Sequence, residues 1–185
     1  MRTVGIVLAG GMSRRFGSPK AFAKYKDDYF YELSYRALEN ICEKVIIVTR
    51  AELMCRFPEN ECTIVDDEMY KGDGPLAGIY SAMRAVEAER YIVLPCDMPF
   101  IDQEVIYSLS KVEQTAMILA VCHNEQFHPL VSIWSGEAKD LLKNALDQNK
   151  LSVMSFLQGT TTEWIPANTL TTDPKTAFQN VNIPF

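Results

Sequence analysis

The sequence predicts a single α/β domain with a doubly wound, mostly parallel sheet between two layers of helices, over residues 1–185. Strand-like apolar runs alternate with segments whose apolar residues recur at helical spacing. The runs at 4–8, 45–48 and 91–94 are apolar almost throughout, which is typical of parallel strands buried on both faces. No internal repeat and no linker rich in Gly, Pro or Ser divides the chain. One three-layer domain with right-handed crossovers is therefore expected.

Four strands and two helices are expected in the first half of the chain. The strands are residues 4–8, 45–48, 62–65 and 91–94. A first helix over about residues 30–41 is indicated by apolar residues that form one face at helical spacing. A second helix opens at Pro75, because proline suits a first helical turn, and its apolar face reaches Val86.

The second half continues the alternation. Asp102 is a suitable N-cap for a helix that runs to about Lys111. Apolar runs follow at residues 117–121 and 128–134, and we expect the second of them to form an antiparallel edge of the sheet. The remaining expected elements are a helix after Ser135, a short helix at 152–157 and a strand at 163–165.

The composition excludes several classes of function. A formal net charge of −6 disfavours nucleic-acid binding. The apolar runs are too short to span a bilayer, and a strand that begins so close to Met1 leaves no room for a signal peptide. Five irregularly spaced cysteines without a Cys-x-x-Cys pair do not match a disulfide framework, and their spacing disfavours a zinc site from Cys55, Cys62 and the two histidines. They indicate reduced thiols in a cytoplasmic protein.

A glycine-rich, cationic loop follows the first strand. Its residues are Leu8-Ala9-Gly10-Gly11-Met12-Ser13-Arg14-Arg15-Phe16-Gly17-Ser18-Pro19-Lys20. Glycines let the backbone approach a ligand closely, and the arginines and lysine supply positive charge. Such a loop can hold a polyphosphate, although an ordinary glycine turn with a solvated basic face is an equal alternative on the loop alone. The spacing of Gly11 and Gly17 does not match a P-loop, so a GTPase is not supported.

Asp97 is the most suggestive single residue of the chain. It follows a fully apolar strand by two residues and stands between Pro95 and Pro99. A carboxylate at the carboxyl end of a strand can hold Mg²⁺ together with phosphate oxygens and water, whereas a turn aspartate is the plainer interpretation. With Arg15 and Lys20 nearby, the ion would neutralise a triphosphate and the charge that grows on leaving pyrophosphate.

Ligands of open α/β sheets bind outside the carboxyl ends of the strands. This rule predicts that four loops form the site: 9–20, 49–52, 66–78 and 95–99.

Four motifs in the chain together resemble a known family. They are Leu8-Ala9-Gly10-Gly11-x3-Arg15-x-Gly17-x2-Lys20, Gly74-Pro75-Leu76-Ala77-Gly78, Pro95-Cys96-Asp97-Met98-Pro99 and Phe178-x-Asn180-Val181-Asn182-x-Pro184. Their order and spacing resemble the molybdenum cofactor guanylyltransferases (MobA-like), which have a Rossmann-like nucleotidyltransferase fold. The resemblance implies transfer of GMP from Mg-GTP to the terminal phosphate of molybdopterin, with release of pyrophosphate. Related cytidylyltransferases carry Ala-Ala-Gly and Asp-Gln-Pro, so the Ala-Gly-Gly and Asp-Met-Pro of this chain favour guanine.

The resemblance also assigns site residues. Leu8, Ala9, Gly10 and Gly11 would contact GTP and Lys20 its phosphates. Asp67 would contact the nucleotide, with Asp66 as its competitor if the loop shifts by one residue. Asp97 would bind both Mg²⁺ and GTP. Arg15, Lys20 and Asp97 are the expected catalytic residues. The family often places Asn after the second strand, where this chain has Val48-Thr49-Arg50.

The expected partners follow from the same resemblance. Residues 1–100 would bind GTP and residues 101–185 the molybdopterin acceptor. Cofactor-biosynthesis proteins and molybdoenzymes are further candidate partners, while nucleic acid and membranes are not expected. The alternatives are a nucleotidyltransferase that uses CTP or another phosphorylated acceptor, and a non-catalytic adaptor that delivers the cofactor.

No acid–base residue is required, because the acceptor phosphate is already ionised and alignment with charge neutralisation suffices. His128 is accordingly expected to be structural or to form part of the acceptor wall. Cys96 is expected to be a buried packing thiol, and Trp134 and Trp164 to be core residues.

Overall fold

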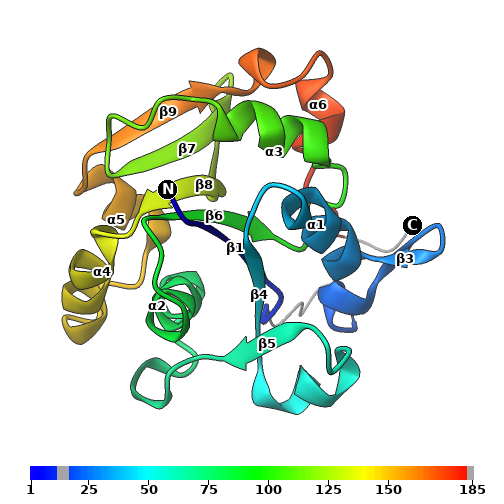
Figure 1. The fold of residues 1–185 in the computed structure, drawn as a ribbon, viewed down its shortest axis with the longest axis vertical. Coiled ribbons are helices and arrows are strands. Elements are labelled where there is room, and N and C mark those ends of the chain that lie inside the picture. The colour runs from blue at the N-terminus through cyan, green and yellow to red at the C-terminus, as the bar shows by residue number, and fades with distance from the viewer. Residues whose placement is uncertain (12–16, 183–185) are drawn as a thin grey trace.

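The computed structural model describes residues 1–11 and 17–182. Seven strands form one sheet in the order β5-β4-β1-β6-β8-β7-β9 (Figure 1). Their bounds are β1 Thr3–Leu8, β4 Lys44–Thr49, β5 Cys62–Val65, β6 Arg90–Pro95, β7 Ile118–His123, β8 Gln126–Ser135 and β9 Thr162–Pro166. A short hairpin, β2 Lys24–Tyr25 and β3 Asp28–Tyr29, stands apart from this sheet and was not expected from the sequence.

The sheet is mostly parallel, as predicted, and one strand runs against the others. β5, β4, β1 and β6 are parallel to one another, whereas β8 is antiparallel to both β6 and β7. β8 therefore lies inside the sheet, and the expectation of an antiparallel edge is wrong in position. A tight turn at Asn124, whose φ is 54°, folds β7 and β8 into a hairpin, and β8 then inserts between β7 and β6. The edge strand on this side of the sheet is β9, which is parallel to β7.

Helices cover both faces of the sheet, which confirms the three layers (Figure 1). The helices are α1 Phe30–Glu39, α2 Pro75–Ala85, α3 Gln103–Ser110, α4 Ala138–Asp147, α5 Val153–Gln158 and α6 Pro174–Ala177. α1 and α3 pack on one face, and α2, α4 and α5 pack on the other. The described residues also contain four 3₁₀ helices: Lys20–Phe22, Ala51–Arg56, Glu68–Tyr70 and Ala167–Thr169.

The apolar strands are buried because successive side chains point to opposite faces. Val7 and Ile47 join the cluster under α1 and α3, whereas Ile6 and Ile46 join the cluster under α2 and α4. All four side chains are fully buried. The predicted N-cap is also confirmed, because the Asp102 carboxylate accepts the backbone N–H of Val105 at 3.0 Å.

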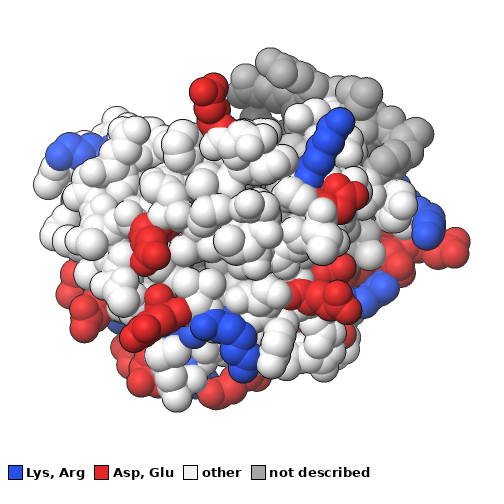
Figure 2. Space-filling model, turned by 90° about the horizontal axis from the view of Figure 1, so that it is seen from above, with Lys and Arg blue, Asp and Glu red and all other residues white. Residues whose placement is uncertain are grey.

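The described helices contain no apolar stretch long enough to cross a bilayer. In Figure 2, the described part of the visible face carries acidic and basic side chains interspersed, and no extended basic patch is seen there.

Candidate functional site

The loops after β1, β4, β5 and β6 begin side by side at the carboxyl ends of these strands, as the sequence predicts. These strands are parallel neighbours, and their ends are in register: Leu8 pairs with Val48 on one side and with Pro95 on the other. Thr49 pairs with Val65 in turn. The candidate site is therefore built on rigid strand ends.

The first loop leaves β1 between its two neighbours. The Ala9 N–H donates to the Val48 carbonyl at 2.8 Å, and the Leu8 carbonyl accepts the Cys96 N–H at 3.2 Å. These bonds continue the sheet by one residue beyond β1. Gly11 is exposed, and a Cβ atom there would meet nothing within 4 Å among the described residues. Arg15, one of the expected catalytic residues, lies outside the described residues.

Lys20 and Asp97 are in contact at the carboxyl ends of these strands. The Lys20 ammonium donates to Asp97 Oδ2 at 3.1 Å and to Asn182 Oδ1 at 2.7 Å. The Lys20 and Asp97 side chains are 14% and 24% exposed, so the pair is partly shielded from water and still reachable. The expected phosphate-binding lysine and the expected metal-binding carboxylate are direct neighbours.

The C-terminal segment closes the same corner. The Val181 N–H donates to the Asp97 carbonyl at 2.8 Å, and the buried Val181 side chain packs on Phe30. This placement brings Asn182 to Lys20. Asn182 was not among the expected site residues, although it belongs to the last of the four motifs, and its contact with Lys20 could not be read from that motif.

Asp66 and Asp67 face different surroundings. A Cβ atom on Gly78 would lie 3.6 Å from Asp66 Oδ1 and 3.2 Å from the Leu8 side chain, so the Asp66 carboxylate lies beside the first turn of α2 and the end of β1. The Asp67 carboxylate instead accepts the Met69 N–H at 3.0 Å and forms an ion pair with Arg84 of α2. Asp66 thus faces the end of β1, and Asp67 faces the side of α2.

Burial raises the pKa of Asp66, and a hydrogen bond from the Gly72 N–H only partly offsets it. A carboxyl whose pKa is raised on folding destabilises the protein once pH exceeds its unfolded pKa, and the cost is absent below that value. We therefore expect Asp66→Asn, which keeps an acceptor for Gly72, to raise the melting temperature at about pH 7 and to lose this gain at about pH 3.5. Differential scanning calorimetry measures both. Asp67→Asn is the control, since it removes the ion pair with Arg84 and should not stabilise. An equal gain at both pH values would contradict the assignment.

The loop that carries Asp66 is anchored from the far side of α2. The buried Tyr70 donates its hydroxyl to Asp147 at the end of α4, and its ring packs on Tyr80 at a centroid distance of 5.4 Å. The same carboxylate is paired with Lys143 at 2.6 Å. No sequence signal pointed to this anchor, because it depends on the packing of α2 against α4.

Several other candidate residues are buried in the way the sequence predicts. Burial raises the pKa of the Cys96 thiol to about 12, so the thiol stays protonated and is no nucleophile. His128 is 3% exposed, and burial, followed by the nearby His123, lowers its pKa. Trp134 is fully buried. Trp164 is half-buried against Phe127 and is thus only partly a core residue.

A divalent metal is compatible with the residues present. Within residues 1–11 and 17–182, no group of three or more His, Cys, Asp or Glu side chains is placed to hold an ion by itself. Asp97 offers one hard, partly exposed carboxylate, and Mg²⁺ commonly takes one or two carboxylates and completes its shell with phosphate oxygens and water. The donor set therefore fits an ion that arrives with a phosphate ligand.

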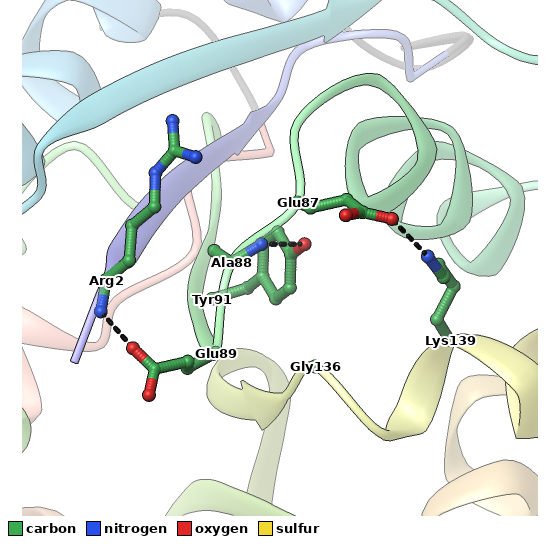
Figure 3. A pocket seen from close by; sticks show the side chains of 7 residues that line it. All are labelled: Arg2, Glu87, Ala88, Glu89, Tyr91, Gly136 and Lys139. Atoms are coloured by element: carbon green, nitrogen blue, oxygen red, sulfur yellow. Dashed lines mark hydrogen bonds and ion pairs between the residues drawn. The ribbon is translucent and has the colours of Figure 1, made fainter.

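One cavity among the described residues lies away from the candidate site. It has a volume of about 440 Å³ and is lined by Arg2, Glu87, Ala88, Glu89, Tyr91, Gly136 and Lys139 (Figure 3). These residues lie at the amino ends of β1 and β6, opposite the candidate site. Its charged side chains are already paired. Lys139 is paired with Glu87 at 3.4 Å, the Arg2 guanidinium with Glu43 at 3.6 Å, and Glu89 with the N-terminal ammonium at 3.8 Å. This cavity is therefore not the candidate site.

Comparisons with known proteins agree with this geometry. The family described as MobA-like NTP transferase domain matches residues 5–163. A probable molybdenum cofactor guanylyltransferase of Geobacillus sp. (strain WCH70) is 37% identical over 99% of this chain and 95% of its own length. The protein of the same name from Bacillus subtilis (strain 168) is 34% identical over 98% of this chain and 91% of its own length.

A solved structure shares the whole fold. Molybdopterin-guanine dinucleotide biosynthesis protein A from Archaeoglobus fulgidus superposes with a TM-score of 0.77 at 26% identity, over 98% of this chain and 93% of that one. The resemblance inferred from the four motifs is thereby confirmed. By sequence and by fold, the chain belongs to the MobA-like NTP transferase family.

Proposed function

We propose that this protein is a molybdenum cofactor guanylyltransferase, which transfers GMP from Mg-GTP to the terminal phosphate of molybdopterin. The observation that carries the proposal is the contact of Lys20 with Asp97, 3.1 Å apart at the sheet edge where the glycine loop begins. A cation for phosphate oxygens and a carboxylate for a metal ion stand side by side there. The names of the relatives supply the acceptor class and the guanine base.

The proposed reaction exchanges one phosphoanhydride bond for another. An oxygen of the acceptor phosphate forms a bond to the α-phosphorus of GTP, while the bond from that phosphorus to the bridging oxygen breaks and pyrophosphate leaves with the electron pair. When bound, Mg²⁺ would neutralise charge on the triphosphate and on the leaving group. The backbone of Leu8–Gly11 would bind the nucleotide, and Lys20 and Arg15 would neutralise phosphate oxygens.

A general base is not needed, because the acceptor phosphate is ionised at neutral pH. The surroundings of the neighbouring groups support this mechanism. The Cys96 thiol is buried with a raised pKa, and the His128 ring is buried with a lowered one, so neither stands exposed as a proton carrier. Alignment and charge neutralisation are the contributions proposed for this chain. Residues 101–185 are proposed to supply the acceptor contacts.

The direct test is incubation with Mg-GTP and molybdopterin, followed by detection of the dinucleotide and of pyrophosphate. No GTP-dependent product with an acceptor known to be active would overturn the proposal. A thermal-shift series with GTP, CTP, ATP and UTP, each with Mg²⁺, tests the base. A clear preference for CTP would assign the protein to cytidylyl transfer.

Replacing Lys20 by alanine is expected to lower kcat/KM by about 5- to 150-fold, equivalent to about 1–3 kcal/mol for the loss of a charge-assisted contact. Steady-state kinetics with Mg-GTP and acceptor measure this. Lys24→Ala is a matched control, because Lys24 is exposed on β2 only four positions along the chain. If the two variants had equal kcat/KM, the proposed role of Lys20 in phosphate binding would be refuted.

A further inference from the structure

The Lys20 ammonium already occupies a cation position at Asp97. Its Nζ lies 3.1 Å from Asp97 Oδ2, and the same nitrogen donates to Asn182 Oδ1 at 2.7 Å. The side chains of Lys20 and Asp97 are 14% and 24% exposed, so solvent screens the pair only in part. The carboxylate proposed to bind a metal ion is therefore neutralised by the protein's own lysine.

A divalent ion that approaches Asp97 in this state meets a positive charge instead of a free carboxylate. Like charges repel strongly at such separations when the surroundings are less polar than bulk water. Mg²⁺ also gives up its water reluctantly and needs further oxygen ligands. The described residues offer no second and third carboxylate to complete a site. Asp97 by itself is thus a poor site for a bare ion.

A triphosphate changes this balance. Its oxygens are new anionic partners for the ammonium, and they are also ligands that complete the shell of the ion. The amide oxygen of Asn182 holds Lys20 at the same corner, so the ammonium needs to move only locally to exchange Asp97 for a phosphate oxygen. The ion and Lys20 would then bind different groups.

We infer that, in the nucleotide-free protein, the Lys20 ammonium occupies the position of a metal ion at Asp97 and prevents divalent ions from binding there. A nucleoside triphosphate would bring the ion to Asp97 and would bind the Lys20 ammonium through its phosphate oxygens. This inference rests on the proposed function for the identity of the triphosphate. It makes metal binding conditional on nucleotide binding. It also gives Lys20 a second task beside phosphate binding, because in the nucleotide-free protein it satisfies the charge of Asp97.

Mn²⁺ binding to the nucleotide-free protein tests the inference, with free Mn²⁺ followed by electron paramagnetic resonance. We expect Lys20→Met to bind Mn²⁺ at least about tenfold more tightly than the wild type, a gain of about 1.4 kcal/mol. Lys20→Gln, which keeps a hydrogen-bond donor but no charge, should show the same gain. Lys20→Arg should bind as weakly as the wild type, since it retains the charge. Lys24→Met is the control for removal of a nearby lysine.

The double variant Lys20→Met with Asp97→Asn locates the effect, because the gain should vanish when the carboxylate is gone. Circular dichroism verifies that each variant is folded. Two results would overturn the inference: Mn²⁺ binding by both uncharged variants that is no tighter than wild type, or a gain that persists in the double variant. The readout needs neither GTP nor molybdopterin. A protein that fails to transfer GMP and still shows the gain would refute the proposed function alone.

Discussion

Asp97→Ala is expected to lower kcat/KM for GMP transfer by at least about 100-fold, since metal neutralisation of a phosphoryl group contributes several kcal/mol to transition-state stabilisation. The substitution removes the carboxylate proposed to hold Mg²⁺ and the anion that orients Lys20 in the free protein. It leaves the backbone bond from the Val181 N–H to the Asp97 carbonyl in place, so the C-terminal segment keeps its attachment. The expected loss is therefore one of chemistry and not of folding.

Steady-state kinetics over a range of Mg²⁺ concentrations measure this loss. Asp27→Asn is the matched control, because Asp27 is exposed in the turn between β2 and β3 and should tolerate the change. If Asp97→Ala retained full activity, the metal role of Asp97 would be refuted. If it spared every cellular function, the adaptor alternative would gain support.

Trp134→Ala is expected to lower the free energy of unfolding by about 3–5 kcal/mol, the range for deleting a buried aromatic side chain. Trp134 on β8 is fully buried, its ring stacks on Phe156 at 5.6 Å, and its indole N–H donates to Ser132 at 2.8 Å. Removing the ring would leave a cavity between the sheet and α5, and would leave the buried Ser132 hydroxyl without this donor. Such a loss is a large fraction of the stability of an ordinary domain.

Urea unfolding followed by far-UV circular dichroism measures this effect, with a two-state fit where the transition supports one. Trp134→Phe should cost less, because it keeps most of the apolar area and loses the hydrogen bond. Trp164→Ala is a second comparison, since Trp164 is only partly buried. Equal stability of Trp134→Ala and wild type would show that Trp134 is not a core residue.

Most of the sheet could be predicted from local patterns. β1, β4 and β6 carry apolar, largely β-branched runs, and such runs have few alternatives to a buried strand. The first residues of α2 and α3 were equally predictable, because Pro75 and Asp102 act within the first turns of their own helices. The position of β8 in the sheet could not be predicted, since an apolar run of this kind fits a strand inside the sheet as well as one at its edge. Its pairing with both β7 and β6 decides the position.

The site divides in the same way. The loops after the parallel strands could be assigned to one edge, because parallel strands end together whatever their order. The roles of Asp66 and Asp67 could not be distinguished, as neighbouring residues in a loop differ only in where the chain turns them. The structure turns Asp66 toward Gly78 and Asp67 toward Arg84.

By itself, the sequence determined the strands of the seven-stranded sheet, the parallel half of that sheet and the family, because each depends on residues close together or on motifs kept in order. Only the tertiary structure decided that Lys20 meets Asp97, 77 positions away, and Asn182, 162 positions away. Those contacts arise where β1, β6 and the C-terminal segment converge, and no local pattern encodes which side chains meet there. The physical reason is that charge pairing acts through space, at distances that the fold sets and the chain order does not.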